Sequence, residues 1–179
     1  FDTTLRFVTR TTQPPSPNKL EVYLVRGTVS LREVAPGVSE TIRGFYSATA
    51  ERVAAFVIFR DLDVMDRETV LFHEYAHHFM LHNFPQAYPS WYVEGWAEFV
   101  STFEFSGRRV IVGSTSTRSY SLFDFDMLPI EQMLAPERVE DEDQYFGYRF
   151  YAIGWFATLY LYNHPERDAG FRRYVEALG

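Results

Sequence analysis

The stretch HEYAHHFML, residues 73–81, places three of the chain's five histidines and one glutamate within six positions. The neighbouring residues from Val70 to Leu81 are otherwise nearly all apolar. Glutamate and histidine side chains are costly to bury unless they have partners. An apolar segment with four such groups therefore indicates a helix that performs chemistry, and the fold can be worked out from it.

Helical spacing separates the polar residues of this stretch into two faces. His73 and His77 are four positions apart, so a helix carries both imidazoles on one side. Glu74 lies about 100° round the helix from His73, where it can reach a water on a metal but is poorly placed as a third ligand. This H-E-x-x-H pattern is typical of a Zn²⁺ site with two histidine ligands and a glutamate as general base.

The remaining histidines have simpler interpretations. His78 points about 100° away from His77, and we expect it to be half-exposed at the surface or beside the site. His82 shares that other face, where a second metal is the weaker alternative. His164 stands next to a proline at a helix end, where a cation suits the helix dipole, and we expect no metal there. For the whole stretch, the alternative is a core helix whose histidines have backbone or carboxylate partners.

A catalytic zinc usually has three protein ligands, so the sequence must supply one more. The metzincin continuation requires glycine and histidine at the positions of Met80 and Asn83, which excludes that class. The next helical segment, WYVEGWAEFV (91–100), follows after a short link and should be a packed neighbour. It carries Glu94 and Glu98 four positions apart among apolar residues. We expect Glu94 to complete a His2Glu set.

The other residues of this second segment have supporting roles. Glu98, one turn beyond Glu94, is placed to accept the free N–H of a ligating histidine. The alternative for Glu98 is a salt bridge to an arginine such as Arg149. Gly95 allows its helix to pack closely on a neighbour.

The sequence HEYAH, followed after eleven residues by PSWYVEGWAEF, resembles the gluzincin zinc metallopeptidases, which include thermolysin-like, aminopeptidase N-like and peptidase MA-like domains. In these enzymes the glutamate of a W-x-x-E-G-x-A-E segment is the third zinc ligand, and an acid four residues later supports a histidine. The resemblance covers residues 42 to about 162 and is tightest over 73–98. It implies a zincin-like α+β fold and assigns these two roles to Glu94 and Glu98.

The resemblance also implies a substrate-binding strand ahead of the zinc helix. In the family, an edge strand pairs with the backbone of an extended substrate. Residues 44–49 occupy its place here, which makes Gly44, Phe45, Tyr46 and Ser47 the expected substrate-binding residues. The family's aminopeptidase motif, G-A-M-E-N, is replaced by GFYSA, which has no acid to hold a substrate's amino terminus. We therefore expect an endopeptidase rather than an aminopeptidase.

A tyrosine downstream of the third ligand hydrogen-bonds the oxyanion in this family, at the start of a helix. Tyr151, followed by Ala-Ile-Gly, best matches the family's Y-x-x-G form, with Tyr148 second and Tyr145 just ahead of both. The alternative is that all three are core or surface aromatics, because tyrosines recur here at helical spacing.

The expected function is therefore that of a zinc-dependent metallopeptidase that hydrolyses peptide bonds in a peptide or protein substrate. Glu74 would be the general base toward the zinc-activated water, and Tyr151 the oxyanion donor. One alternative is a non-catalytic zinc-site domain that serves as a peptide-binding or structural module. Another is a hydrolase that acts on a different carbonyl compound.

Composition narrows the remaining classes. The net charge of −7 without Lys/Arg blocks argues against nucleic acid as a main partner, and the absence of cysteine excludes disulfides and thiolate ligands. No apolar run approaches the roughly 18 residues that span a bilayer. Compartment and oligomeric state stay open. The start at Phe1 and the end inside an expected helix suggest a piece of a longer protein.

Patterning along the chain predicts a single α+β domain with a mixed sheet, sheet-rich over 1–65 and helical over 66–179. The active-site helix is expected at 67–83 with Asp66 as N-cap, and the next helix at 91–105 with Ser90 as N-cap. Expected strands are 5–10, 20–26, 42–49, 52–60 and 107–113, while 28–34 fits either a helix or a strand. Further expected elements are a loop at 114–126, a short helix within 129–137, an acidic turn at 140–143, a helix at 144–162 and a last helix from 168.

Overall fold

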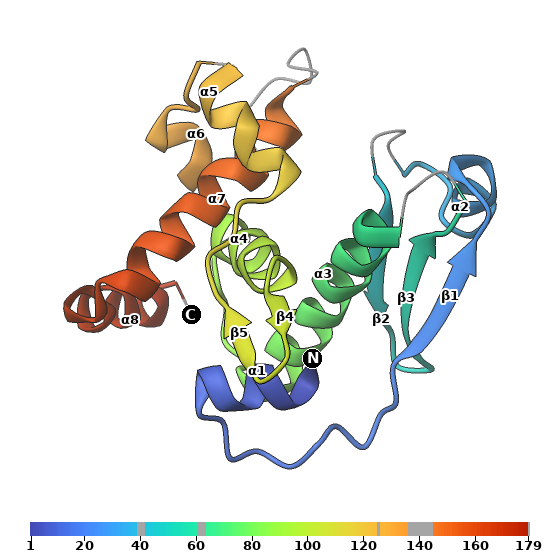
Figure 1. Cartoon of the computed structure of the whole chain (residues 1–179), viewed down its shortest axis with the longest axis horizontal. Helices are drawn as coiled ribbons and strands as arrows, with labels where there is room; N and C mark the ends of the chain where they lie inside the picture. The colour runs from blue at the N-terminus through green and yellow to red at the C-terminus, as the bar shows by residue number, and fades with distance from the viewer. Residues whose placement is uncertain (39–41, 61–63, 125, 136–144, 179) are drawn as a thin grey trace. The chain divides into compact units, whose positions relative to one another are not determined.

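The protein was described from a computed structural model, which defines residues 1–38, 42–60, 64–124, 126–135 and 145–178 (Figure 1). The chain is mixed α and β, as expected, and divides into two compact units, Phe1–Pro85 and Gln86–Gly179. The first unit holds a three-stranded sheet with helices, and the second is mainly helical with one β-hairpin.

The sheet of the first unit is mixed, as expected, with strand order β1–β3–β2. Strand β1 (Glu21–Val25) pairs parallel with β3 (Val53–Ile58), and β2 (Gly44–Ala48) pairs antiparallel with β3. The Thr49 N–H donates to the Arg52 carbonyl at 2.9 Å, which closes the expected Ala-Glu turn between β2 and β3. Strand β2 therefore lies at an edge of this sheet.

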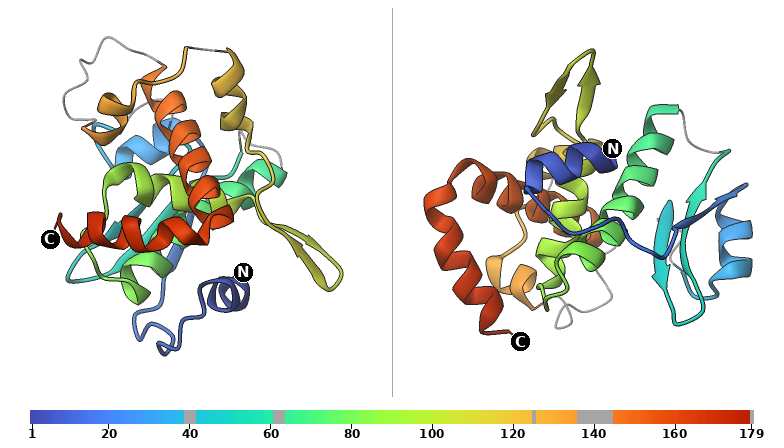
Figure 2. Two further views of the ribbon diagram at one scale, coloured as in Figure 1. Left: turned by 90° about the vertical axis from the view of Figure 1, so that its left-hand side faces the viewer. Right: turned by 90° about the horizontal axis from the view of Figure 1, so that it is seen from below.

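Helices lie on both faces of the sheet. Helix α2 (Thr28–Val34) is on one side and α3 (Val64–Asn83) on the other, as the views in Figures 1 and 2 agree. A central strand between two layers is buried on both faces, which explains the continuous apolar sequence of β3. The α2 side of this core consists of Leu31, Ala54, Phe56 and Ile58. Segment 28–34, which patterning left open, is therefore a helix.

The expected strand at 5–10 is wrong, because these residues lie in or next to helix α1 (Asp2–Thr9). Alternation over so few residues fits a helix equally well, and an i,i+4 ion pair adds local support to the helix. Arg6 Nε donates to the Asp2 carboxylate at 2.8 Å, while Leu5 is completely buried.

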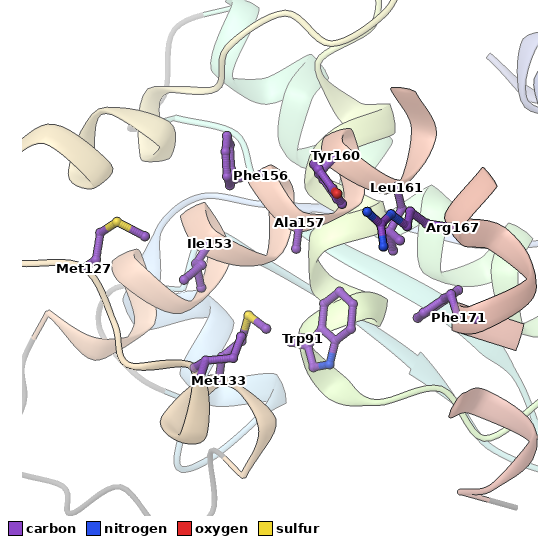
Figure 3. A pocket seen from close by; sticks show the side chains of 12 residues that line it. Trp91, Met127, Met133, Ile153, Phe156, Ala157, Tyr160, Leu161, Arg167 and Phe171 are labelled. Carbon is purple, nitrogen blue, oxygen red and sulfur yellow. The ribbon is translucent and has the colours of Figure 1, made fainter. Parts of the chain in front are cut away.

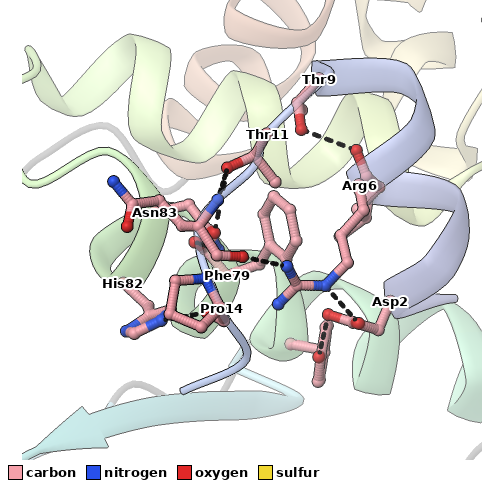
Figure 4. Close-up of polar contacts among 11 residues, drawn as sticks. Asp2, Arg6, Thr9, Thr11, Pro14, Phe79, His82 and Asn83 are labelled. Atoms are coloured by element: carbon pink, nitrogen blue, oxygen red, sulfur yellow. Dashed lines mark hydrogen bonds and ion pairs between the residues drawn. The ribbon is translucent and has the colours of Figure 1, made fainter.

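Helix α1 is held against the second half of α3. The Tyr75 hydroxyl donates to Asp2 Oδ1 at 2.7 Å, and the Arg6 guanidinium lies 5.9 Å from the centre of the Phe79 ring (Figure 4). Burial and the bond to Asp2 raise the pKa of Tyr75, so its hydroxyl keeps its proton and remains a donor.

Helix α3 differs from expectation only at its start. It begins at Val64, so Asp66 lies within the first turn instead of forming the N-cap, while residues 61–63 lie outside the described part of the chain. The helix ends at Asn83, as predicted, where Asn83 Nδ2 donates to the Phe79 carbonyl at 2.8 Å.

Two helices form the centre of the second unit. Helix α4 (Ser90–Ser101) crosses α7 (Phe146–Asn163) where two glycines face each other. A Cβ on Gly95 would lie 2.8 Å from the Gly154 Cα, and a Cβ on Gly154 would lie 2.7 Å from the Trp91 carbonyl oxygen. Only glycine permits this approach, so Gly95 does allow close helix packing, but its partner is α7, whereas the sequence predicted packing against the preceding helix.

The C-terminal part of the expected 91–105 helix is a strand. Helix α4 ends at Ser101, and β4 (Glu104–Ser106) pairs with β5 (Arg109–Ile111) as a hairpin that extends beyond the helices of its unit (Figure 2). Gly107 has φ +59°, which the tight turn requires and which glycine adopts without strain. The strand expected at 107–113 is thus confirmed only over residues 109–111.

Several smaller elements complete the second unit. Pro89, and not Ser90, is the N-cap of α4. Within the expected loop at 114–126, the 3-10 helix η1 (Thr117–Tyr120) is followed directly by a short helix. The acidic turn at 140–143 lies outside the described residues. The other helices are α5 (Ser121–Asp124), α6 (Ile130–Leu134), η3 (Pro165–Arg167) and α8 (Asp168–Glu176).

Within the described part of the chain, no helix is both long enough and apolar enough to cross a bilayer.

Candidate active site

Helix α3 brings the two histidines of the H-E-x-x-H motif together. The Nε2 atoms of His73 and His77 lie 3.1 Å apart, with the rings edge to face at 4.8 Å between centroids. Two nitrogens that bind one tetrahedral zinc at ordinary bond lengths are separated by about 3.3 Å. The imidazole pair therefore has the spacing of two ligands of one ion, which is the arrangement that the i,i+4 spacing predicted.

Glu74 is buried, with 5% of its surface exposed, and it lies beside the start of the edge strand β2. A Cβ on Gly44 would lie 3.0 Å from Glu74 Oε1, 2.7 Å from a Val70 methyl carbon and 2.9 Å from the Phe56 carbonyl oxygen. Because glycine has no side chain, the carboxylate of Glu74 can lie directly against the strand.

Strand β2 follows the histidine-bearing face of α3. Two residues beyond Gly44, the Tyr46 ring lies 6.4 Å from the His77 ring and 6.0 Å from the His78 ring. Phe45, on the opposite face of the strand, instead stacks on Phe56 at 4.6 Å. The side chains of these two expected substrate-binding residues therefore have contacts within the protein.

The structure corrects the expectation for His78. Its side chain is buried, with 8% exposed, and its Nδ1 lies 3.4 Å from the Tyr46 hydroxyl. Burial lowers the pKa of His78, with a smaller contribution from His82, so it is held neutral. His82 Nε2 donates to the Pro14 carbonyl at 3.1 Å. The two rings have different partners, which does not favour the alternative of a second metal between them.

His164 is the C-cap of α7, at the helix end where it was expected. Its Nδ1 lies 3.0 Å from Glu166 Oε1.

In the second unit, Glu98 forms an ion pair with Arg118 of η1, while the carboxylate is 3% exposed. The alternative partner Arg149 instead donates to the Asp126 carbonyl at 3.3 Å. Burial opposes the charge of Arg118, but the negative charges of Glu98 and half-buried Glu94 outweigh it and raise the arginine pKa.

The same arginine contacts the tyrosine that was favoured as oxyanion donor. The Arg118 guanidinium carbon lies 4.5 Å from the centre of the Tyr151 ring, a cation–π contact. Tyr151 is half-buried on α7, whereas Tyr145 and Tyr148 are 44% and 39% exposed. Of the three tyrosines, Tyr151 is therefore the one whose ring is held by the arginine that pairs with Glu98.

Arg118 is the residue that sequence reasoning missed. It lies in the Ser/Thr-rich segment STSTRSYS (114–121), which reads as a surface loop because nothing in it repeats at helical or strand spacing. The available signal was a single arginine among small polar residues. It lies about 20 positions after Glu98, an acid in an apolar segment that should require a cationic partner.

No protein-family model, curated protein sequence or solved structure matches the chain. Within the first unit, the structure places Glu74, His73 and His77 next to strand β2. Within the second, it places Glu98 and Tyr151 around Arg118.

Replacing Gly44 with alanine tests the contact between β2 and Glu74. The new methyl group would lie within 3.0 Å of Glu74 Oε1 and Val70, so the carboxylate must shift away from the strand. For the peptidase that the sequence predicts, we expect cleavage to fall about 10- to 100-fold, because a displacement of about 1 Å can cost that much. Initial rates on a peptide substrate measure the effect.

Gly147→Ala is the matched control for this experiment, because nothing lies within 4 Å of a Cβ at Gly147. Unchanged cleavage in the Gly44→Ala protein, with zinc content equal to the wild type, would contradict a role for this contact.

Proposed function

We propose that the chain is a zinc-dependent metallopeptidase domain of the gluzincin type with a zincin-like fold, which hydrolyses internal peptide bonds of a peptide or protein substrate. One observation carries the proposal: two histidine Nε2 atoms lie 3.1 Å apart on a helix that also presents a buried glutamate beside an edge strand. A structural zinc site needs the histidines but has no use for that glutamate.

His73, His77 and Glu94 would hold the zinc ion. The two histidines lie on α3 of the first unit, and Glu94 is half-buried on α4 of the second. Two imidazoles and one carboxylate are a donor set that suits catalytic zinc and leaves a coordination position for water. When bound, zinc supplies a Lewis acid that makes water more acidic and polarises a carbonyl oxygen.

Glu74 handles the proton in the proposed reaction. Its carboxylate takes a proton from the attacking water and later delivers it to the nitrogen of the departing amine. The environment of Glu74 supports this role, because the group is largely screened from solvent while one oxygen faces the start of β2.

Tyr151 is the proposed hydrogen-bond donor to the oxyanion of the tetrahedral intermediate. One such donor contributes about 3–4 kcal/mol to transition-state stabilisation. Arg118 restrains the tyrosine ring at 4.5 Å and pairs with Glu98, so it would position both groups. We also propose that Glu98 accepts the N–H of a ligating histidine and so orients that ring.

Strand β2 is the proposed substrate-binding edge. An extended peptide adds to a free sheet edge through main-chain hydrogen bonds, which positions its backbone with little regard to sequence. Residues Gly44 to Ser47 would provide these bonds. Gly44, at the start of this strand, lies against Glu74, and Tyr46 lies near His77. The strand therefore follows the face where the reaction would take place.

The metal content of the purified chain tests the ligand set. We expect about one zinc per wild-type chain, and a loss of zinc after dialysis from the Glu94→Ala variant, because only two protein ligands remain. Elemental analysis by mass spectrometry measures the ratio. Glu104→Ala is the matched control, since it removes an exposed carboxylate of β4 with the same change in charge.

Incubation of the zinc-loaded wild type with a mixed peptide library, followed by mass spectrometry, tests the reaction. New fragments cut at internal bonds support an endopeptidase. Zinc binding without cleavage of any peptide would favour the non-catalytic module. Full zinc retention in the Glu94→Ala protein would overturn the proposed third ligand.

A further inference from the structure

The second unit contains an apolar groove that the proposed peptidase site does not use. The groove has a volume of about 580 Å³, and all of its lining residues belong to the second unit (Figure 3). Its lining includes the buried Trp91 and Met133 and the partly buried Phe171. No residue proposed for the zinc site lines it.

One face of α7 forms the length of the groove. The contributing residues follow the spacing i, i+3, i+4, i+7, i+8, which is a single helical stripe that extends over about 12 Å of helix. Ile153 is part of the buried core, and Ala157 and Leu161 pack against that core. Phe156 and Tyr160 are 49% and 43% exposed, so their part of the stripe is open to solvent. The stripe consists of Ile153, Phe156, Ala157, Tyr160 and Leu161.

A single cation closes one end of this apolar surface. Figure 3 shows Arg167 at the end of the groove opposite Met127, with its guanidinium directed toward Tyr160 and Leu161. Arg167 is exposed and forms no salt bridge with another described residue, although its charge acts on the neighbouring Glu166, whose side chain bonds to His164 at 3.0 Å. Its guanidinium can therefore pair with an anionic group in the groove.

We propose that this groove binds a single-chain amphiphile with a carboxylate head, such as a fatty acid, whose chain lies along the α7 stripe and whose carboxylate pairs with Arg167. The volume is within the roughly 300–1,000 Å³ of small-molecule sites, which combine apolar walls with few polar groups. An extended peptide fits less well, because apolar walls would leave its backbone N–H and C=O groups without partners.

Titration calorimetry with dodecanoate, kept below its micelle concentration, tests the proposal. We expect saturable binding of one dodecanoate per chain. Arg167→Gln should weaken that binding about tenfold, because the charge-assisted contact is lost. The uncharged 1-dodecanol should bind the variant and the wild type equally. Arg108→Gln, which makes the same change of charge in the exposed β4–β5 turn, should leave dodecanoate binding unchanged.

A second variant obstructs the groove without removing a charge. At Gly170, which lines the groove on α8, the nearest atom to an added Cβ is Arg173 Nη2 at 4.0 Å. Gly170→Leu should therefore fold, as circular dichroism can confirm, and should weaken binding of both dodecanoate and 1-dodecanol.

Three results would overturn the proposal: no saturable binding of dodecanoate, undiminished binding in folded Gly170→Leu, or equal affinity for dodecyltrimethylammonium. None of these measurements depends on zinc or on peptide cleavage, so the groove and the peptidase site can fail independently.

Discussion

Replacement of Glu74 by glutamine is expected to lower peptide cleavage by about 10²- to 10⁴-fold while zinc remains bound. Glutamine has nearly the same shape, so it should preserve the contact with the start of β2 at Gly44. Its amide cannot accept the proton of the attacking water, and the general-base step is lost. His73 and His77 are unchanged, so the metal should stay in place.

Cleavage rates and zinc content must be measured on the same preparations of this variant. Glu68→Gln is the matched control, because Glu68 is an exposed glutamate on the same helix and its replacement makes an identical change of charge. The control should retain wild-type cleavage. A zinc-loaded Glu74→Gln protein that cleaves peptides at the wild-type rate would remove the general base from the mechanism.

The second large effect is expected at the crossing of α4 and α7. In Gly95→Ala, the added methyl group would lie 2.8 Å from the Gly154 Cα and would also meet the Gly154 carbonyl. These are backbone atoms, which cannot rotate away as a side chain could, so the helices must separate. We expect the free energy of unfolding to fall by about 3 kcal/mol, although alanine favours a helix over glycine by about 1 kcal/mol.

Urea unfolding followed by circular dichroism measures this loss of stability. Gly147→Ala is again the control, because that glycine lies in the first turn of α7 with open space around it, and it should be unchanged or slightly stabilised. A Gly95→Ala protein as stable as the wild type would show that the crossing can widen without cost.

The active-site helix was predictable because its signal is local. Apolar residues without glycine or proline define α3, and its C-terminus at Asn83 follows directly from the sequence. The spacing of His73 and His77 fixes their rings on one face whatever else the chain does, since a helical turn brings i and i+4 together. The observed Nε2 separation of 3.1 Å is a consequence of that periodicity.

The predictions that missed concern residues whose structure or partner depends on contacts with residues distant in the sequence. The segment that includes Leu5 and Arg6 alternates like a strand, yet α1 is stabilised by contacts with Tyr75 and Phe79, more than 70 positions away. For Glu98 the sequence named Arg149 only as one example of an alternative ion-pair partner, whereas its partner Arg118 comes from a segment without periodicity. A pattern over six residues contains no information about which distant residue will form an ion pair with one of them.

The sequence by itself determined which reactive side chains are present. These are two imidazoles and a glutamate on one helix, and a pair of glutamates in the apolar segment that follows. Spacing along a helix is a property of the local backbone, so no tertiary information was needed. The tertiary structure decided which partner each group receives. It placed Gly44 against Glu74, buried His78 and brought Arg118 to Glu98 and Tyr151. These outcomes depend on how separate segments pack, which local periodicity does not contain.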